Sequence, residues 1–268
     1  MKDELEYEKL KEIIFLEYIK RKKEENLLKR DIQLFQNIIE LYFKKDRQPY
    51  FKEIIDRYKE RYILDESRIE ENITLEEQLG LGEIYDFIRD FDYSQDNFNV
   101  FFTSLIIHEK LYSKSPNNNF GGKLRNVNVS LFDLDIEVLD YKNAIIEFNK
   151  YLNPNISNQI FKNYNEKELF LYIKDSIILT TKLIKLQPFQ DGNKRTFRAL
   201  LNLLFKRVNI PPIFIEISER DEYKSALIKA LITNDYQDII KFYYYKICDA
   251  IILLDIENSN ESIKTLIK

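Results

Sequence analysis

The chain has 268 residues, of which 44% are hydrophobic and 14% aromatic, so it can bury a large core and is not a disordered chain. Its 41 basic and 45 acidic side chains nearly cancel to a formal charge of −4, which excludes the overall positive field that favours nucleic acid. The single cysteine, Cys248, and the single histidine, His108, exclude a disulfide framework, a cysteine-based zinc site and a multi-histidine metal site.

The first twenty residues, MKDELEYEKLKEIIFLEYIK, carry charges throughout. They contain neither the apolar segment of a signal peptide nor a membrane span. We therefore expect a cytoplasmic protein that has no membrane and no nucleic acid among its partners. A leaderless secreted effector would show the same features.

Helical periodicity dominates the chain, which has only five glycines and six prolines. Apolar residues recur at spacings of three and four, with charged residues on the opposite, solvated face. This pattern predicts an all-α fold. The predicted helices are 3–44, 50–63, 67–78, 81–91, 97–113, 138–151, 165–186, 193–207, 219–232 and 235–255.

One region departs from the helical pattern. The stretch SPNNNFGG (115–122) is the strongest loop signal in the chain, because it is rich in glycine and asparagine. The stretch that follows it, KLRNVNVSLFDLDIEV, alternates well enough to predict a short strand or hairpin near 120–132. The expected fold is therefore all-α with one small β excursion.

The most informative stretch is LQPFQDGNKRTFR (186–198), a loop between two predicted helices. Pro188 ends the first helix, because the residue before a proline is disfavoured in the α region. Gly192 directly precedes the second helix, where unpaired N–H groups and the helix dipole attract an anion. Asn193 adds a side-chain donor beside those groups.

Charged residues flank this predicted anion site. Arg195 and Arg198 are three residues apart, so they lie on one helical face and can bind the same group. Asp191 is placed to hold a divalent cation through oxygen, and Mg²⁺ is the usual partner of phosphates. The alternative is an ordinary polar connection between helices, because Asp-Gly-Asn also forms good turns.

The stretch resembles the signature of the Fic family, H-P-F-x-[DE]-G-N-[GK]-R-x-x-R, at every specified position except the first, where Gln187 stands. The resemblance covers roughly residues 85–245. Further similar segments follow in family order: IIHEKLY (106–112), GGKLRNVNV (121–129), NIPPIFI (209–215), RDEYKSAL (220–227) and NDYQDIIKF (234–242).

The resemblance implies a Fic-type helical bundle with a small β-hairpin flap. In this organisation residues 1–84 form an N-terminal helical region that carries an inhibitory helix at about 65–78. Residues 85–245 form the Fic core, which includes the flap at about 115–132 and the active-site loop at 186–198. Residues 246–268 are the end of the C-terminal helix and a tail.

Fic proteins mostly transfer AMP from Mg-ATP to a hydroxyl side chain of a target protein. The resemblance implies that Asp191 binds the metal and that Gly192, Asn193 and Lys194 surround the α- and β-phosphates. It also implies a phosphate-binding role for Arg195. The partners expected on this basis are ATP, with Mg²⁺, and a target protein.

The resemblance also implies roles for Arg198 and for the flap. Arg198 matches the arginine that binds the γ-phosphate. Lys194 also occurs in the Doc branch, which transfers phosphate instead, but that branch usually lacks the second arginine. The flap would align the target by strand pairing. Its implied docking residues are Gly122, Lys123, Leu124 and Arg125.

The stretch SRIEEN (67–72) resembles the inhibitory motif of the family, whose glutamate pairs with the second arginine. One register uses Ser67 and Glu71. The other uses Glu70, which better matches the common wording SRIEGN and leaves Glu66 in place of the usual serine or threonine. We favour Glu70. The alternative is a surface glutamate on an amphipathic helix.

Gln187 stands where the family has the histidine that takes the proton from the attacking hydroxyl. A glutamine amide has no pKa near neutrality, so transfer should be severely weakened while phosphate binding survives. His108 is expected to be a buried structural histidine rather than a relocated base. Three hypotheses remain: a slow or altered AMP transferase, an engineered inactive variant, and a natural pseudoenzyme that binds nucleotide or a partner. A Doc-like kinase is a more distant one.

Overall fold

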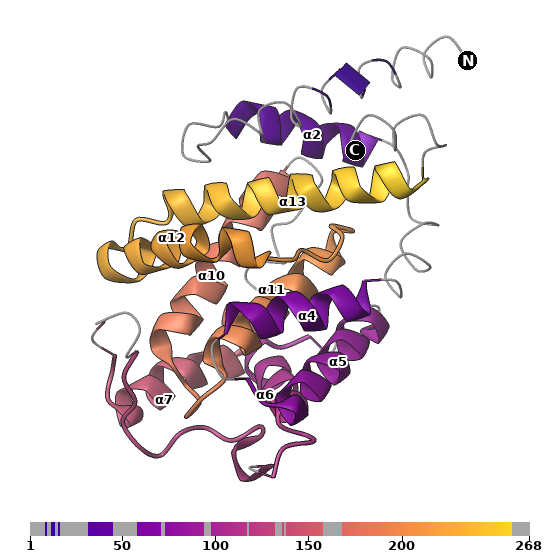
Figure 1. Ribbon diagram of the computed structural model, residues 1–268. Helices are drawn as coiled ribbons and strands as arrows, with labels where there is room; N and C mark the ends of the chain where they lie inside the picture. The colour runs from indigo at the N-terminus through magenta and orange to yellow at the C-terminus, as the bar shows by residue number, and fades with distance from the viewer. Residues whose placement is uncertain are drawn as a thin grey trace.

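The computed structural model describes residues 9, 12, 13, 16, 32–44, 58–70, 73–93, 98–116, 118–131, 136, 138–157 and 168–258, with backbone alone at 41–44, 118 and 253–258. Within these ranges the predicted all-α class is confirmed (Figure 1). The α-helices are α2 (Ile32–Lys44), α4 (Lys59–Ile69), α5 (Leu75–Asp90), α6 (Val100–Leu111), α7 (Tyr141–Asn149), α8 (Pro154–Ser157), α10 (Leu169–Leu186), α11 (Asn193–Arg207), α12 (Arg220–Thr233) and α13 (Gln237–Asn258). Short 3₁₀ turns are η4 (Asn118–Phe120), η5 (Lys150–Leu152) and η7 (Ile217–Glu219).

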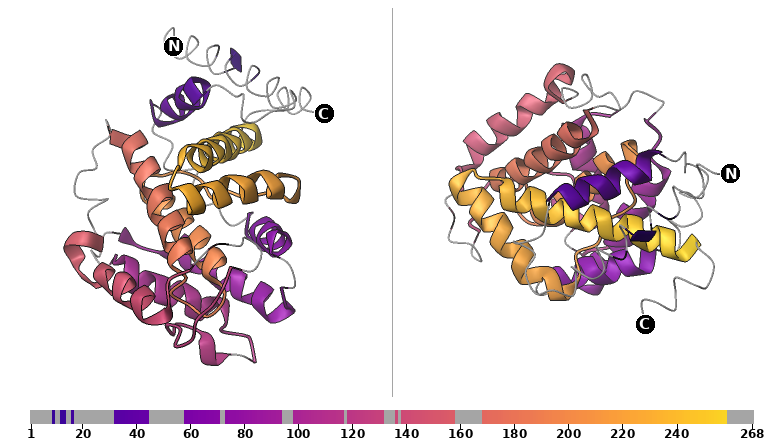
Figure 2. Two further views of the ribbon diagram at one scale, coloured as in Figure 1. Left: turned by 90° about the vertical axis from the view of Figure 1, so that its left-hand side faces the viewer. Right: turned by 90° about the horizontal axis from the view of Figure 1, so that it is seen from above.

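The centre of the fold is α11, whose side chains are almost all buried. It packs against α10 on one side and against α5 and α6 on the other. Helices α13 and α2 pack together at the opposite end of the molecule from α6 and α7 (Figures 1 and 2). The stretch TFRALLNLLFKR is apolar around most of its circumference, and this composition suits a helix surrounded by others.

One hydrophobic core runs through all three predicted regions of the chain, from Leu34 on α2 to Ile252 on α13. The predicted boundary at 84/85 lies inside α5, and the one at 245/246 lies inside α13. The loop 186–198, which joins α10 and α11, is therefore held within a single packed body.

The predicted inhibitory helix at 65–78 is interrupted, which corrects the sequence-based prediction. Helix α4 ends at Ile69, Glu70 adopts an extended conformation, and α5 begins at Leu75. The cause is a capping box: the Thr74 hydroxyl accepts a hydrogen bond from the Glu77 N–H, and the Glu77 carboxylate accepts one from the Thr74 N–H. The chain therefore leaves the helical conformation at Glu70.

Gly80 lies within α5 and does not precede a new helix, contrary to the prediction. A Cβ at this position would lie 2.0 Å from the carbonyl oxygen of Leu111 at the end of α6. The glycine therefore permits close contact between α5 and α6. This contact matters for the site, because Tyr112 follows directly.

The predicted β-hairpin flap is wrong within the described residues. Residues 121–130 form no strand, and the region has one isolated antiparallel bridge, between Leu131 and Ile136. Backbone groups here bond to other partners: the Arg125 N–H donates to the Pro188 carbonyl at 3.0 Å. The alternating pattern predicts a strand, but here a backbone N–H bonds to the neighbouring loop and not to a second strand.

No helix among the described residues is both long enough and apolar enough to cross a membrane.

Candidate functional site

The loop between α10 and α11 begins and ends with a residue in the left-handed region of backbone conformation. Gln187 ends α10 with φ 49°, and Gly192 precedes α11 with φ 72°. A Cβ at Gly192 would lie 2.8 Å from Leu111 Cδ2 and 2.9 Å from the Tyr112 hydroxyl. Both the dihedral angle and the close approach therefore require glycine at 192.

Asn193 holds the loop together from inside. Its Oδ1 accepts from the Phe189 N–H at 3.0 Å, and its Nδ2 donates to the Phe189 carbonyl at 2.9 Å and to Gln187 Oε1 at 3.0 Å. This corrects the prediction that the Asn193 side chain points at an anion. The Asn193 side chain positions the loop, and only its backbone N–H remains available at the helix N-terminus.

Gln187 is buried, and both ends of its amide are hydrogen-bonded. Its Nε2 donates to the Ile184 carbonyl at 2.6 Å, and its Oε1 accepts from Asn193. The side chain is therefore part of the loop scaffold. It does not present a free polar atom to a substrate.

His108 connects the loop to the segment predicted as the flap. Its Nδ1 accepts from the Gly122 N–H at 3.0 Å, so its Nε2 carries the proton and donates to the Asp191 carbonyl at 3.0 Å. The ring stacks on Phe189 with the centroids 3.9 Å apart. His108 is thus a buried structural histidine, as expected.

Arg125 makes a second connection between the same two segments. Its Nε donates to the Gln187 carbonyl at 2.6 Å, and its Nη1 and Nη2 donate to the carbonyls of Val127 and Leu139 at 3.1 and 2.6 Å. The side chain is buried, so it holds the segment in place and offers nothing to a docking protein. By contrast, Lys123 is exposed, and Gly122 and Leu124 are partly exposed.

Arg195 lies beneath the loop, among three oxygen-bearing side chains. Its Nη1 donates to Glu77 Oε1 at 2.8 Å, and its Nη2 donates to the Tyr112 hydroxyl at 3.3 Å. Asp191 Oδ2 lies 3.5 Å from Arg195 Nη2. The second oxygen of Glu77 belongs to the capping box of α5, so one carboxylate both starts that helix and holds Arg195.

Arg198 is contacted by two carboxylates from α4 and its end. Glu66 Oε2 accepts from Nη2 at 2.7 Å and from Nε at 2.9 Å, and Glu66 Oε1 lies 3.2 Å from Nε. Glu70 Oε1 lies 2.9 Å from Nη1, and Glu70 Oε2 lies 3.0 Å from Lys194 Nζ. Burial would raise the pKa of Glu70, but Arg198 and Lys194 together lower that pKa to about 2.

The structure therefore brings Glu70 to the predicted arginine and adds Glu66. In the sequence, Glu66 stands out only as a departure from the usual motif. Its spacing of four residues from Glu70 was the available signal, because such residues share one helical face. Ser67 donates to the Ile63 carbonyl within α4, at 2.5 Å, and does not reach the site. Glu71 lies outside the described residues.

Comparison with known families identifies one similar family. Residues 103–205 match the model of the Fic/DOC family. This segment is therefore similar to the Fic/DOC family.

The similar proteins resemble only part of this chain. Protein adenylyltransferase Fic of Aedes aegypti is 39% identical over 65 residues, which are 24% of this chain and 13% of that protein. Protein adenylyltransferase fic-1 of Caenorhabditis elegans is 42% identical over 55 residues, which are 20% of this chain and 11% of that protein. The chain thus matches well under two thirds of the length of these relatives.

Solved structures share the fold over most of the chain. Fic-1 of C. elegans has a TM-score of 0.63 at 17% identity and covers 83% of this chain and 69% of that one. A Fic domain containing signaling protein from Bacteroides thetaiotaomicron VPI-5482 has a TM-score of 0.66 at 11% identity, covering 82% of this chain and 95% of that one. The similarity therefore extends on both sides of the matched Fic/DOC domain.

A metal site at the loop 186–198 would rest on Asp191. Its side chain is 70% exposed, and its Oδ1 accepts from the Gly192 N–H at 2.6 Å. No cluster of three or more acidic, histidine or cysteine side chains suited to a metal occurs among the described residues. One exposed carboxylate is nevertheless the usual protein contribution to Mg²⁺ that is bound with a nucleotide, because phosphate oxygens and water supply the other ligands.

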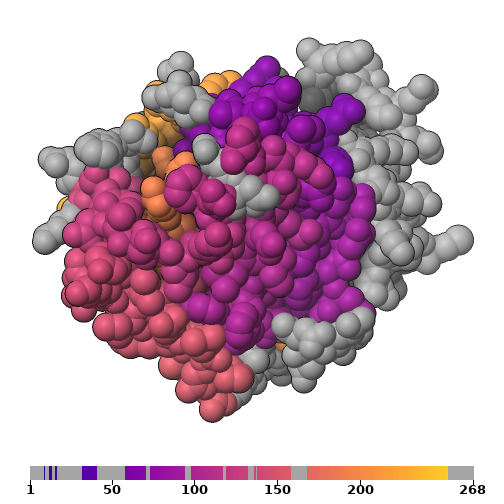
Figure 3. Space-filling view, turned by 90° about the horizontal axis from the view of Figure 1, so that it is seen from below, coloured from indigo at the N-terminus to yellow at the C-terminus, as the bar shows by residue number. Residues whose placement is uncertain are grey.

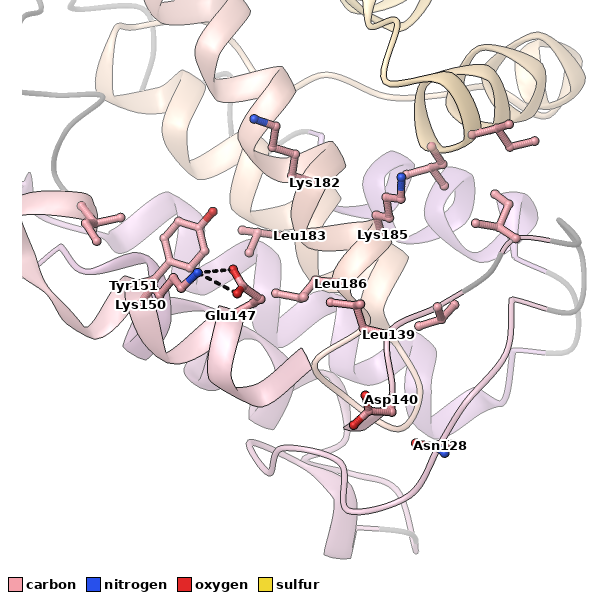
Figure 4. Close-up of a pocket in the computed structure, with 15 residues that line it drawn as sticks. Asn128, Leu139, Asp140, Glu147, Lys150, Tyr151, Lys182, Leu183, Lys185 and Leu186 are labelled. Atoms are coloured by element: carbon pink, nitrogen blue, oxygen red, sulfur yellow. Dashed lines mark hydrogen bonds and ion pairs between the residues drawn. The ribbon is translucent and has the colours of Figure 1, made fainter. Parts of the chain in front are cut away.

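A cavity of about 1170 Å³ lies beside the start of the loop 186–198, between α7, the end of α10, the end of α12, Ile136 and residues 138–140. Leu186 and Leu183 reach into it from α10, and the Lys150–Glu147 ion pair lies on its far side (Figure 4). None of the predicted phosphate-binding residues lines it. Seen from below, orange atoms of the α10–α11 region are visible between surfaces formed by residues of the 100–157 region (Figure 3).

Acidification is expected to destabilise the protein through His108. Burial lowers the pKa of His108 to about 4, with the Asp191 carbonyl opposing and nearby Arg195 adding to the decrease. The unfolded chain therefore binds a proton near pH 6.5 and the folded one near pH 4, so stability is lost as pH falls across this window. From pH 7 to pH 5 we expect a loss of about 2 kcal/mol in the free energy of unfolding.

Urea denaturation of the wild type and of His108→Gln at both pH values measures this effect. The chain has one histidine, so the difference between the two pH profiles reports His108 alone. Parallel profiles would show that the ring titrates normally in the folded protein.

Proposed function

We propose that this protein binds Mg-ATP at the loop 186–198 and transfers AMP to a hydroxyl side chain of a target protein. The observation that carries the proposal is the arrangement of Lys194, Arg195 and Arg198 around the helix N-terminus that Gly192 opens. Each of these cations forms an ion pair with a carboxylate from α4, from the residue after α4, or from α5. Together with the helix dipole they suit a polyphosphate.

In this proposal the backbone N–H groups after Gly192 and the Lys194 ammonium bind the α- and β-phosphates. Arg195 binds a phosphate oxygen, and Arg198 binds the γ-phosphate. Asp191 would hold Mg²⁺, which neutralises phosphate charge. The target oxygen attacks the α-phosphorus and gives up its proton to water, a new O–P bond forms, and the bond to the β-phosphate breaks as pyrophosphate leaves. Such transfer depends mainly on positioning and charge neutralisation.

The target protein is proposed to dock along the segment 121–131. Lys123 and Val127 lie on its exposed side. Arg125 supports the segment from beneath, because it binds three backbone carbonyls. Docking through backbone groups would make the register of the target segment matter more than its individual side chains.

The hydroxyl proton has no acceptor at position 187, because the Gln187 amide cannot take it. A second candidate function is therefore a Fic-fold protein that binds nucleotide, or a partner, without transfer. The observation that favours it is that both polar atoms of the Gln187 side chain are already bonded within the loop. Incubation with Mg²⁺ and ATP labelled at the α-phosphate separates the two: labelled protein supports transfer, and its absence beside measurable ATP binding supports the second function.

Glu70 is proposed to inhibit by occupying the place of the terminal phosphate. Its carboxylate contacts both Arg198 and Lys194, and its depressed pKa of about 2 keeps it ionised near neutrality. A triphosphate must therefore displace it. The comparison with Glu71 stays open, since Glu71 lies outside the described residues.

Replacing Glu70 with glycine is expected to tighten Mg-ATP binding by roughly tenfold, or about 1.4 kcal/mol, because a competing carboxylate is removed. Titration calorimetry measures the change. Glu60→Gly is the matched control, because Glu60 is an exposed glutamate in the first turn of α4, the helix that Glu70 follows. Equal ATP affinity in Glu70→Gly and in the control would contradict the inhibitory role.

A further inference from the structure

The two carboxylates on Arg198 occupy different edges of its guanidinium group. Glu66 binds the edge formed by Nε and Nη2, with contacts of 2.7 to 3.2 Å. Glu70 approaches the remaining nitrogen, Nη1, at 2.9 Å. A planar guanidinium held on one edge has a fixed orientation, so its other nitrogen points in a defined direction.

The two contacts also differ in how firmly they are built. Glu66 lies inside α4, its side chain is 5% exposed, and it forms hydrogen bonds with Arg198. Glu70 lies just past the end of α4 in extended backbone and divides its oxygens between Arg198 and Lys194. Among the described residues, neither Glu70 Oε1 nor Arg198 Nη1 has an aligned hydrogen bond. Glu70 is therefore the more easily displaced partner.

A buried guanidinium requires a counter-charge at all times. Arg198 is 3% exposed, and a buried ion that loses its partner strongly destabilises the fold. If Glu70 were the sole carboxylate at Arg198, its departure would leave that charge unbalanced until a phosphate arrived. With Glu66 in place, Arg198 stays balanced while Glu70 moves away.

We propose that Glu66 is a positioning residue that fixes Arg198 and keeps it charge-balanced, so that Glu70 can be exchanged for the terminal phosphate of a nucleoside triphosphate. This inference rests on the proposed function. The two neighbouring glutamates thus have opposite effects on triphosphate binding: Glu70 opposes it, and Glu66 supports it. Simple charge counting predicts instead that removing either carboxylate favours the triphosphate.

The test compares Glu66→Gln and Glu70→Gln by calorimetric titration with Mg-ATP and Mg-ADP. The decisive quantity is the ratio of the two affinities, because ADP lacks the phosphate assigned to Arg198. We expect Glu70→Gln to raise the ATP-to-ADP affinity ratio about tenfold and Glu66→Gln to lower it about fivefold, since Glu70 then becomes the sole counter-charge and is held more tightly.

Each other outcome has a defined meaning. A higher ratio in Glu66→Gln overturns the inference and makes Glu66 a second inhibitor. Equal losses of ATP and ADP binding overturn it as well, because they show a purely structural role. If circular dichroism shows Glu66→Gln to be unfolded, Glu66→Asp provides the same comparison, since it keeps the charge but shortens the reach; a ratio at or above wild type overturns the inference.

The design separates this inference from the proposed function. Binding of neither nucleotide to the wild type or to Glu70→Gln overturns the proposed function and this inference with it. Tighter ATP binding in both Glu66→Gln and Glu70→Gln leaves the proposed function standing and overturns the inference alone.

Discussion

Replacing Gln187 with histidine is expected to raise the rate of AMP transfer to protein by roughly 10²–10⁴-fold, the usual contribution of a general base. The left-handed backbone at 187 accepts histidine more readily than most side chains. Gln187 Nε2 now donates to the Ile184 carbonyl at 2.6 Å, and an imidazole N–H can make the same bond. The second ring nitrogen then remains free to take the hydroxyl proton.

The measurement follows incorporation of label from ATP labelled at the α-phosphate, with Mg²⁺ present. Gln190→His is a matched control, because it adds a histidine to an exposed position of the same loop. If only the Gln187→His variant yields labelled protein, the wild-type loop lacks the general base and no other part of the transfer site. Equal labelling of both variants and the wild type would show that residue 187 does not limit transfer.

Replacing Arg198 with methionine is expected to lower the free energy of unfolding by about 3–5 kcal/mol, because two buried carboxylates lose their shared counter-charge. The other contacts of Glu66 and Glu70 cannot compensate fully: Lys194 still forms an ion pair with Glu70, but the ion pair described for Glu66 is the one with Arg198. For a chain of this length the midpoint of thermal unfolding should fall by roughly 10 °C. The same variant should lose its preference for ATP over ADP.

Lys194→Met is the matched control for this substitution. Lys194 contacts the same Glu70, but its side chain is 27% exposed, compared with 3% for Arg198. A partly solvated pair contributes at most about 1 kcal/mol. Similar losses of stability in the two variants, measured by calorimetry, would contradict the central position of Arg198 in this network.

The sequence predicted most of the helical framework, because helical periodicity reflects local chemistry. Helix α11 has the predicted bounds, Asn193–Arg207, and α10 ends at Leu186 as the following proline required. The pairing of Glu70 with Arg198 was predicted from family resemblance, and the structure brings these two side chains together. The burial and tethering of His108 were also expected.

The errors arose where tertiary contacts decided the outcome. The predicted inhibitory helix 65–78 runs across the Thr74–Glu77 capping box, whose T-x-x-E pattern in the sequence marks the start of a new helix. Asn193 was assigned to an anion because local spacing does not show that its amide folds back on Phe189. The predicted hairpin is absent from residues 121–130, where the Arg125 N–H donates to the Pro188 carbonyl of the neighbouring loop.

The single imidazole ring between Gly122 and Asp191 has a consequence for protein engineering. One nitrogen is committed to the Gly122 N–H and the other to the Asp191 carbonyl, so neither segment can shift without breaking a bond to the other. A segment transplanted from a relative into 118–131, to change which proteins are recognised, must therefore supply a backbone N–H at the same place. Exchanges that ignore this joint would alter the loop 186–198 along with the segment 118–131.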